Sequence, residues 1–332
     1  MAFNIDIIEQ NILEYNRYLL DILLQDHTTG ENIRWATDDY EHLGELYRAE
    51  AEIFPNLITG SSTNIIQPRV AKAAAEQSAR TRSKAEVFTP SWICNEQNNL
   101  VDDSWFGRQN VFNTPVTNDN GSKGWIVNSD VIEFPDVKGK SWKDYVDARR
   151  MEISCGEAPY LVSRYDTVSG RAIPVNERIG LLDRKLRVIS ENVDEPDLWF
   201  KWAVRAYESI YGFEYQGDNV LLARENLLYT FIDNYAAKFG EQPSLIQTKS
   251  VATKISWNIW QMDGITMTAP YSKRENAGQI SFALDALFSG ATEEDDIYNK
   301  ADTTAIPCVI MDWRSKVKVV YKDMLTGGSN GR

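Results

Sequence analysis

Histidine and cysteine are scarce in this chain of 332 residues, and their scarcity argues against several kinds of site. We expect the two histidines, His27 and His42, at the surface, and no serine–histidine or cysteine–histidine nucleophile can be argued from them. The three cysteines, Cys94, Cys155 and Cys308, are widely spaced and form no CxxC pair. That spacing argues against a structural zinc site or a disulfide framework, so we predict a reducing compartment and no metal.

Long apolar runs and an excess of basic residues are also missing. No run approaches the ~18 residues that span a bilayer, and acids at the N-terminus replace the basic region of a secretory signal. We therefore expect a cytoplasmic protein outside the membrane. The net charge is −13, whereas a protein that binds DNA alone usually has a basic face. If DNA is a partner, we expect another subunit to supply basic surface in a homo- or hetero-oligomer. The alternative is that the acidic surface only aids solubility.

The apolar pattern separates a helical first part from an α/β remainder. Apolar residues recur at helical spacing over residues 5–25 and 40–54, so residues 1–80 are predicted to form a mostly helical N-terminal unit. In residues 81–332 strands alternate with helices, which predicts a sheet that binds ligands where its strands end. The elements expected there are loops and short strands at 88–134, helices at 177–193, 196–210 and 219–240, strands at 211–216 and 256–263, and a strand pair at 307–325.

The stretch RRMEISCGEAPYLVSRYD, residues 149–166, is typical of a strand, a turn and a helix. Glu152 lies near the end of the strand, and Gly156 permits a positive φ or a close approach of the backbone. Pro159 suits the first turn of a helix. Such a turn can bind a polar ligand through main-chain N–H groups and one carboxylate. A tight turn without any ligand is the alternative.

Two further acids follow apolar strands. Glu214 ends the strand YGFEYQ, and an acid in this place can bind both hydroxyls of a ribose. The helices at 177–210 would then be an insertion in the crossover. Asp263 precedes Gly264 after the next strand and could accept a hydrogen bond from an exocyclic amine such as that of adenine. A solvated Glu214 and a turn-forming Asp-Gly pair are the alternatives.

Four segments occur in a distinctive order: KAEVFTPSW (84–92), MEISCGEAPYL (151–161), YGFEYQGDN (211–219) and NIWQMDG (258–264). In this order they resemble the S-adenosylmethionine-binding motifs of N6-adenine DNA methyltransferases, specifically modification subunits of restriction–modification systems. The resemblance implies a Rossmann-like class I methyltransferase sheet with helices on both faces, and S-adenosyl-L-methionine as cofactor. It implies these contacts: Phe88, Thr89 and Pro90 at the methionine end, Glu152, Cys155 and Gly156 at the amino-acid part and ribose, Glu214 at the ribose hydroxyls, and Asp263 at the adenine.

The chain departs from this family at the catalytic motif, which in the family is Asn or Asp followed by two prolines and an aromatic residue. The best candidate is CVIMDWRSK (308–316), where Asp312 and Trp313 are adjacent and no prolines intervene. By the resemblance, Asp312 would accept a hydrogen bond from the target adenine amine and Trp313 would stack on the flipped base. Packing in the core or at its rim is the alternative for Trp313.

One more segment, IRWATDDY (33–40), also reads as a strand that ends in acids and an aromatic residue. It could add an edge strand to the sheet, or it could bring Asp38, Asp39 and Tyr40 to the pocket.

Three functional hypotheses remain open from the sequence. The first is a DNA adenine-N6 methyltransferase of a restriction–modification or phage-related system, in which positioning of the amine carries most of the catalysis. The second is a catalytically degenerate, methyltransferase-like subunit of a defence complex that binds the cofactor or nucleic acid. The third is an α/β protein whose turn motifs are coincidental.

Overall fold

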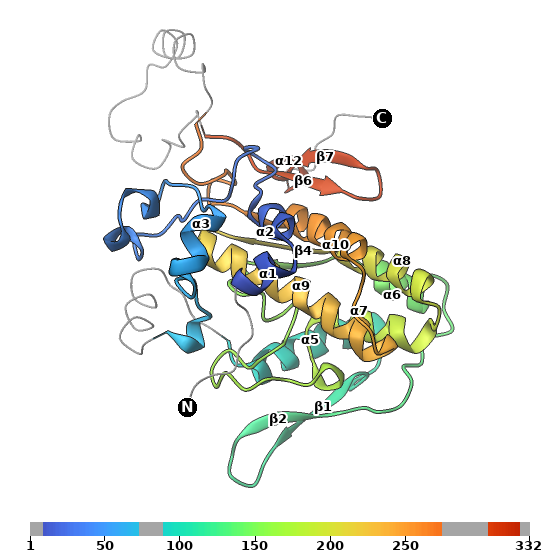
Figure 1. The fold of residues 1–332 in the computed structure, drawn as a ribbon. Helices are drawn as coiled ribbons and strands as arrows, with labels where there is room; N and C mark the ends of the chain where they lie inside the picture. Colours follow the sequence, from blue (N-terminus) through green and yellow to red (C-terminus); the bar gives the residue numbers. More distant parts are fainter. Residues whose placement is uncertain (1–8, 73–88, 274–304, 326–332) are drawn as a thin grey trace, which may run out of the picture.

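Three parallel strands form the central sheet and place the chain in the α/β class (Figure 1). The computed structural model describes residues 9–72, 89–273 and 305–325. Strand β3 (Arg150–Ile153) pairs with β4 (Ile210–Glu214), which pairs with β5 (Ile259–Gln261). Because parallel strands all end on the same side, the sheet has a carboxyl end and an amino end, and ligands of such sheets bind at the carboxyl end.

Helices connect the three strands and confirm the predicted alternation. They are α7 (Leu181–Asn192) and α8 (Pro196–Tyr207) between β3 and β4, and α9 (Gly217–Phe239) and α10 (Leu245–Asn258) between β4 and β5. Gly240 ends α9 in a left-handed conformation with a φ of 73°, as a helix-ending glycine often does. The predicted strand at 256–263 is shorter in the structure, because α10 extends to Asn258.

The sheet separates two hydrophobic cores. Ile210 and Ile259 point into the large core shared with the connecting helices. Tyr211, Phe213 and Trp260 alternate with them along β4 and β5 and point into a smaller core on the opposite face. This alternation is expected of strands, in which successive side chains point to opposite faces.

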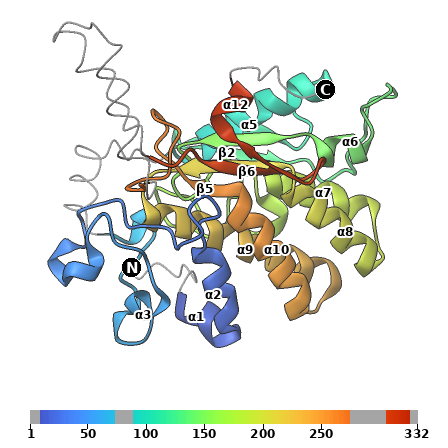
Figure 2. The same cartoon turned by 90° about the horizontal axis from the view of Figure 1, so that it is seen from above.

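A terminal hairpin covers the second face of the sheet, where helices were expected. It consists of β6 (Val309–Asp312) and β7 (Val317–Val320), which pair antiparallel as predicted and lead into α12 (Tyr321–Leu325). The Tyr321 ring lies 5.3 Å from the Trp260 ring and 6.1 Å from the Phe213 ring. Figure 2 shows the hairpin and α12 on one side of the sheet and helices α8 to α10 on the other.

Strand β3 lies at the outer edge of the sheet. Among the residues that the structure describes, no strand pairs with its free side. Two apolar side chains of this strand are exposed, Met151 at 39% and Ile153 at 69%.

The N-terminal helical pattern forms two helices rather than one. Helices α1 (Glu9–Tyr15) and α2 (Arg17–Leu24) are separated at Asn16, whose side chain caps α2 by accepting from the Tyr18 N–H at 3.1 Å. Buried leucines of α2 belong to the same core as α9 and α10. The predicted boundary between residues 80 and 81 lies outside the described residues and stays a prediction.

The helix predicted at 40–54 is wrong. Two 3-10 turns, η1 (Glu41–Leu43) and η2 (Glu45–Tyr47), occupy part of this range, and a turn and an isolated bridge at Glu52 follow. Gly44 separates them with a φ of 125°, which an α-helix cannot contain. The smaller elements of the first part are α3 (Pro55–Ile58), η3 (Gly60–Ser62) and η4 (Arg69–Ala71).

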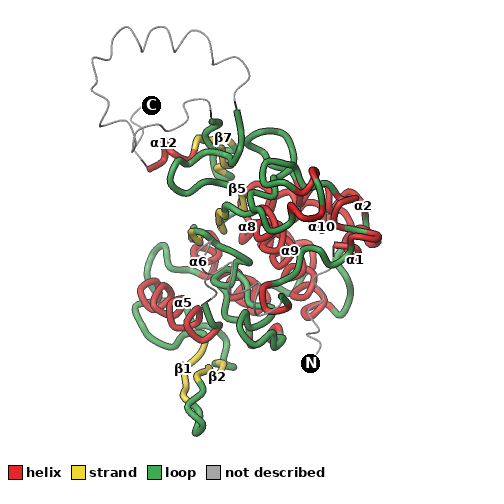
Figure 3. Tube along the Cα trace, turned by 90° about the vertical axis from the view of Figure 1, so that its left-hand side faces the viewer, coloured by secondary structure: helices red, strands yellow, loops and turns green. Residues whose placement is uncertain are grey.

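Helix α5 (Ser91–Phe106) lies where loops and short strands were expected. Its inner face carries asparagines and aspartate instead of an apolar stripe, because the buried Arg184 guanidinium binds Asp102 at 2.6 Å and Asn99 at 2.7 Å. The remaining elements are β1 (Asn113–Thr117), β2 (Lys123–Val127), α6 (Trp142–Asp147) and η5 (Val175–Glu177). Hairpin β1–β2 projects from the body of the molecule (Figure 3). Across the described ranges, every helix is too short or too polar to cross a membrane.

Candidate functional site

A cavity of about 1070 Å³ lies at the carboxyl end of the sheet, and we call it the sheet-end pocket. Its lining comes from the ends of β3 and β4, from the segments that follow β3, β4 and β5, from Thr89, and from residues within 36–50 of the N-terminal segment. Ligand pockets commonly enclose roughly 300–1,000 Å³. The pocket is therefore large enough for a nucleotide-sized ligand.

The turn after β3 forms one wall of the pocket. Three of its residues adopt left-handed backbone conformations, Ser154 with a φ of 48°, Gly156 with 52° and Ala158 with 63°. Cys155 lies buried between them and donates its N–H to the Phe213 carbonyl at 2.9 Å. Left-handed conformations at non-glycine residues are strained and tend to cluster at ligand sites. Thus the predicted residues Cys155 and Gly156 both line the pocket.

The helix predicted to start at Pro159 is wrong. The segment forms turns, an isolated β-bridge between Tyr165 and Ala172 and the short η5, and the next α-helix is α7 at Leu181. The Glu152 carboxylate accepts the N–H groups of Tyr160 at 3.4 Å and Leu161 at 3.2 Å. A side chain therefore binds backbone donors in this segment, which competes with helix formation.

Glu152 is 8% exposed and lines the pocket from β3. Burial raises the pKa of its carboxyl group well above the usual range, the two N–H groups that it binds lower the pKa, and the nearby charge of Glu214 raises it further. Among the described residues that line the pocket, none is a lysine, arginine or histidine that could compensate this carboxyl group. The group is therefore poised to gain from a cationic ligand.

Glu214 connects the ends of two strands. Its carboxylate accepts the N–H of Gly156 at 3.0 Å, that of Tyr215 at 2.9 Å and that of Gln216 at 3.2 Å. Burial raises the pKa of Glu214, while these three hydrogen bonds oppose the rise. The predicted pair of acids at successive strand ends is thus brought together on one side of the pocket.

The N-terminal segment forms a further wall of the pocket, which favours the prediction that residues 33–40 reach it. Gln261 on β5 binds the Arg34 backbone, accepting its N–H at 2.8 Å and donating to its carbonyl at 2.7 Å. Gly217 donates its N–H to the Trp35 carbonyl at 2.9 Å. A Cβ at Gly217 would lie 2.0 Å from the Arg34 carbonyl oxygen, so only glycine allows this close approach.

Acids on this wall add to the charge of the pocket. Asp38, Glu41 and Glu50 all line the pocket. The other two residues considered from this segment support its conformation instead: the Asp39 carboxylate accepts from the Thr37 hydroxyl at 2.7 Å, and the Tyr40 hydroxyl donates to Asp218 at 2.9 Å.

The FTP segment reaches the pocket through Thr89. Thr89 lines the pocket, and its carbonyl accepts the Thr167 hydroxyl at 2.9 Å. Pro90 is the N-cap residue of α5 and is not among the lining residues. Phe88 lies outside the described residues.

Asp263 lies between two residues that line the pocket, Met262 and Gly264. One oxygen of its carboxylate accepts the N–H groups of Ile265 at 2.8 Å and Thr266 at 3.0 Å. The structure therefore shows the turn-forming contacts that were the alternative for this aspartate. The residues that reach the pocket from this region and were not predicted are Met262, Gly264 and Tyr271.

Asp312 and Trp313 lie at the amino end of the sheet, away from the pocket. Asp312 pairs with Arg149 just before β3 at 2.8 Å, and the Trp313 indole N–H donates to Asn258 just before β5 at 2.7 Å. The Lys254 ammonium lies 4.3 Å from the Trp313 ring centre. The structure therefore shows Trp313 in the packing role that was its alternative, and it does not bring this pair to the predicted cofactor residues.

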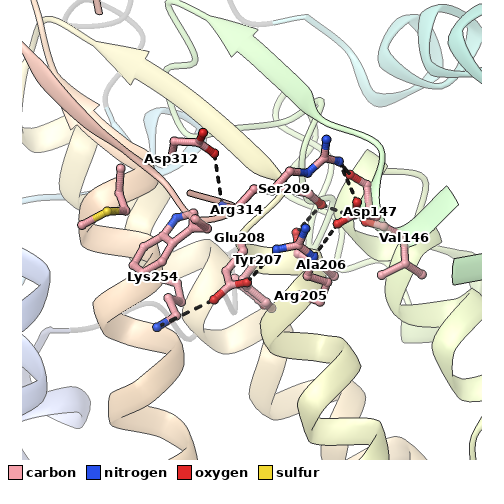
Figure 4. Close-up of polar contacts among 12 residues, drawn as sticks. Val146, Asp147, Arg205, Ala206, Tyr207, Glu208, Ser209, Lys254, Asp312 and Arg314 are labelled. Carbon is pink, nitrogen blue, oxygen red and sulfur yellow. Dashed lines mark hydrogen bonds and ion pairs between the residues drawn. The ribbon is translucent and has the colours of Figure 1, made fainter. Parts of the chain in front are cut away.

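Ion pairs fill the amino end of the sheet (Figure 4). The Asp147 carboxylate pairs with Arg205 and, at 2.6 Å, with Arg314. Glu208 pairs with Arg205 at 3.1 Å and with Lys254 at 4.0 Å. The small cavity among these side chains has a volume of ≈ 0 Å³, so it leaves no room for a ligand.

Cysteine and histidine add no reactive group. All three cysteines are free and buried. The prediction that His27 lies at the surface is wrong, because its ring stacks on Trp257 at 3.8 Å and is partly buried. Burial, together with the charges of Arg224 and Lys318, lowers the pKa of His27 to about 3. Within the described ranges, no group of three or more His, Cys, Asp or Glu side chains could hold a metal ion.

Comparisons of the chain with protein-family models, with curated proteins and with solved structures find no match. Its function must therefore be argued from the residues and charge of the sheet-end pocket.

Proposed function

We propose that the sheet-end pocket binds S-adenosyl-L-methionine and that the chain is the modification subunit of an N6-adenine DNA methyltransferase. The charge of the pocket carries the proposal. Its lining includes the acids Asp38, Glu41, Glu50, Glu152 and Glu214, and none of its described lining residues is a lysine, arginine or histidine. Such a lining repels cofactors that carry phosphates. S-adenosylmethionine has no phosphate and carries a sulfonium and an ammonium group.

The residues present fit this cofactor. Gly156 and its strained turn would face the amino-acid part and the ribose, Glu214 would accept from the ribose hydroxyls, and Glu152 would add negative charge beside them when it is ionised. When bound, the cofactor supplies a methyl group that a nucleophile can attack. The part of this chain is to bind and orient the cofactor, and its buried carboxylates favour a positively charged ligand.

The proposal that DNA is the substrate is based on the order of the four sequence segments, which resemble the motifs of N6-adenine DNA methyltransferases. All four segments contribute residues to the pocket. They are Thr89 from the first, Gly156 from the second, Glu214 from the third and Met262 from the fourth. A net charge of −13 supports a role for a more basic partner subunit in holding DNA.

Calorimetric titration tests the cofactor. We expect S-adenosylmethionine to bind and NAD⁺ and ATP not to bind, because only the first lacks phosphates. Glu214→Gln keeps the size of the side chain but removes its charge, and it should weaken binding by about 10- to 100-fold, the range typical of a lost charged hydrogen bond.

The matched control lies at the other end of the same strand. Glu208→Gln changes an acid that precedes β4 at the ion-pair network, so it should leave the affinity within about twofold. Equal binding by wild type and Glu214→Gln, or binding of ATP in preference to S-adenosylmethionine, would reject the proposal.

The position of Asp312 and Trp313 favours a second candidate function. Neither residue reaches the pocket, so the described residues include no counterpart of the predicted catalytic pair beside the cofactor site. On this second proposal the chain binds S-adenosylmethionine as a subunit of a defence complex and does not itself transfer the methyl group.

Methyl incorporation separates the two candidates. Purified chain, S-adenosylmethionine carrying a labelled methyl group and mixed-sequence DNA should give labelled N6-methyladenine if the first proposal holds. Cofactor binding without incorporation, with or without added partner subunits, would select the second.

A further inference from the structure

Two carboxyl groups far from the sheet-end pocket are fully buried. Glu9 of α1 is 1% exposed and Glu225 of α9 is 0% exposed, and neither lines the pocket. None of their four carboxyl oxygens has a hydrogen-bond partner in the part of the chain that the structure describes. Buried polar groups are nearly always hydrogen-bonded, so two such exceptions call for a physical explanation.

The cations near these helices are engaged elsewhere. Lys72 pairs with Asp218 at the start of α9, at 3.4 Å, and the buried Arg224 guanidinium donates to backbone carbonyls, among them that of Leu23. The charged residues on α2 and in the loop at Pro243, both of which contact α1, are exposed to solvent: Arg17, Asp21 and Glu241. A buried carboxylate without a cation or a donor is costly, so Glu9 and Glu225 favour their neutral, protonated forms.

The titration of the two groups agrees with this environment. Burial raises the pKa of Glu9 to about 7. Burial also raises the pKa of Glu225 well above its usual range, and the charge of Glu9 raises it further. Both carboxyl groups therefore keep their protons at mildly acidic pH, and Glu9 loses its proton near neutral pH.

Helix α1 depends on tertiary contacts to stay folded. It has only seven residues, and an isolated helix of this length is not stable in water. Its buried residues are Glu9 and Ile12, one turn apart on the same face, and Ile12 packs in the large core. Two hydrogen bonds join its side chains to other segments: from the Gly60 N–H to Gln10 Oε1 at 3.0 Å, and from the Tyr15 hydroxyl to the Pro243 carbonyl at 3.2 Å. Half of the buried face of this short helix is thus a carboxyl group without a partner.

We propose that Glu9 and Glu225 form a proton-operated latch, in which α1 docks on the core while both carboxyl groups are protonated and detaches when they ionise. Detachment lets water solvate both carboxylates, so the detached state binds protons less tightly than the docked state. Rising pH then favours detachment. The latch does not depend on the ligand of the sheet-end pocket.

The pH range of the effect follows from the two states of Glu9. Its pKa is about 7 in the docked state and roughly 4.3 when solvated. Docking is fully favoured below the lower value and weakens as pH rises toward the higher one, by up to about tenfold per pH unit for each group. Glu225 changes docking in the same direction, because its pKa is also raised.

Hydrogen–deuterium exchange tests the latch in the full chain. After correction for the intrinsic exchange rate, protection of the α1 amides should fall by about tenfold or more per pH unit between about pH 5 and pH 7. Protection of the α10 amides should stay higher at each pH, because α1 opens without unfolding the rest. Glu9→Gln and Glu225→Gln keep the size of the side chain and remove the ionisable group, so each should reduce the slope, and the double variant should show protection of α1 that is independent of pH.

Glu14→Gln is the matched control. Glu14 lies on the same helix but is exposed, so this variant should show the slope of the wild type. Circular dichroism at each pH checks that every variant is folded. If Glu9→Gln fails to fold, Glu225→Gln still tests the latch, because it leaves the sequence of α1 unchanged.

Three results would overturn the proposal: protection of α1 that does not change between pH 5 and pH 7, an equal fall in wild type and a folded double variant, or equal protection of α1 and α10 at every pH. The last result would show that α1 opens only when the whole fold does. None of these measurements involves S-adenosylmethionine, so failure of the latch and failure of the proposed cofactor are detected separately.

Discussion

The two ends of the central sheet both carry acidic side chains, but the surroundings of these side chains differ between the two ends. At the carboxyl end, Glu152 and Glu214 are bound by backbone N–H groups, and burial raises their pKa values. At the amino end, burial raises the pKa of Asp312, but hydrogen bonds from Ser315 and Arg314 and the charges of Arg149 and Arg314 together outweigh burial and lower the pKa.

The contrast separates a binding role from a structural role. Carboxylates paired with arginines are already neutralised, and side chains fill the space around them. Carboxyl groups that backbone donors hold in an open cavity, with pKa values raised by burial, gain from a cation that stabilises their ionised form. An acid at the end of a strand therefore indicates a ligand site only when its surroundings contain no basic partner.

Gly217→Ala should have the largest effect, because it acts on the wall of the carboxyl end. The added Cβ would lie 2.0 Å from the Arg34 carbonyl oxygen, and a backbone atom cannot move aside as a flexible side chain can. We expect the free energy of unfolding in urea to fall by about 3 kcal/mol.

Gly124→Ala is the matched control for this substitution. Gly124 lies on β2 and a Cβ there would meet no atom within 4 Å, so stability should change by less than about 0.5 kcal/mol. Equal losses of stability in the two variants would show that the close approach of Gly217 to the Arg34 backbone does not stabilise the fold.

The pH dependence of cofactor binding gives the next effect. A cation gains most from ionised Glu152 and Glu214, whose pKa values lie above the usual one, so affinity for S-adenosylmethionine should rise with pH. We expect up to about tenfold per pH unit between the usual carboxyl pKa and the raised values, measured by calorimetry, and a shallower rise in Glu214→Gln.

Without ligand, the contribution of Glu214 to the stability of the fold should decrease as pH rises. Because the folded-state pKa of Glu214 is raised, its contribution is fully present below the usual carboxyl pKa and is lost as pH rises through the folded value. Glu214→Gln should therefore gain stability relative to wild type as pH rises. An affinity that falls with pH would contradict the charge argument.

Asp147→Asn tests the amino end, where the expected effect is on stability alone. The substitution weakens the pairs with Arg205 and Arg314, which are partly exposed, so we expect a loss of about 1 kcal/mol in urea unfolding. Affinity for S-adenosylmethionine should stay within about twofold of wild type, since the residue does not line the pocket. A large loss of affinity would show that the two ends are coupled.

Asp312→Asn should have the smallest effect, about 0.5 kcal/mol, because its pair with Arg149 is half exposed. Its folded-state pKa is lowered, so the stabilisation is present above the usual aspartate pKa and disappears as pH falls through the lowered value. Unfolding curves at neutral and acidic pH measure this difference. Loss of methyl transfer with unchanged cofactor binding would instead restore Asp312 to the catalytic role predicted from the sequence.

Local patterns predicted the carboxyl end of the sheet well. The strand ends at Glu152 and Glu214 and the glycine turn between them depend on short-range preferences that the sequence carries. The long connection through α7 and α8 could also be predicted from the sequence, because each helix has an apolar face.

Long-range contacts could not be predicted in the same way. No local pattern shows that Gln261 binds the Arg34 backbone. The sequence does not predict helix α5, because its buried face is polar and the partner of that face, Arg184, is distant in the chain.

The position of Asp312 depends on the direction of a strand. At the start of β6 the Cys308 thiol lies 3.4 Å from the Gln261 carbonyl at the carboxyl end, whereas Trp313 contacts Asn258 at the amino end. The strand thus runs against β5, which places its last residue at the end opposite to the pocket. The sequence marks this run as a strand but does not encode its direction in any local signal.

One side of β3 pairs with no strand of the described residues, and this bears on how the protein behaves in concentrated solution. An unpaired strand presents main-chain donors and acceptors on which a second chain can build, and the exposed Met151 and Ile153 would add apolar contact to such an assembly. The strand has only four residues, and Arg149 and Arg150 stand at its start. Shortness and adjacent charge are the means by which native sheets discourage aggregation, and the protection from charge weakens as salt screens it.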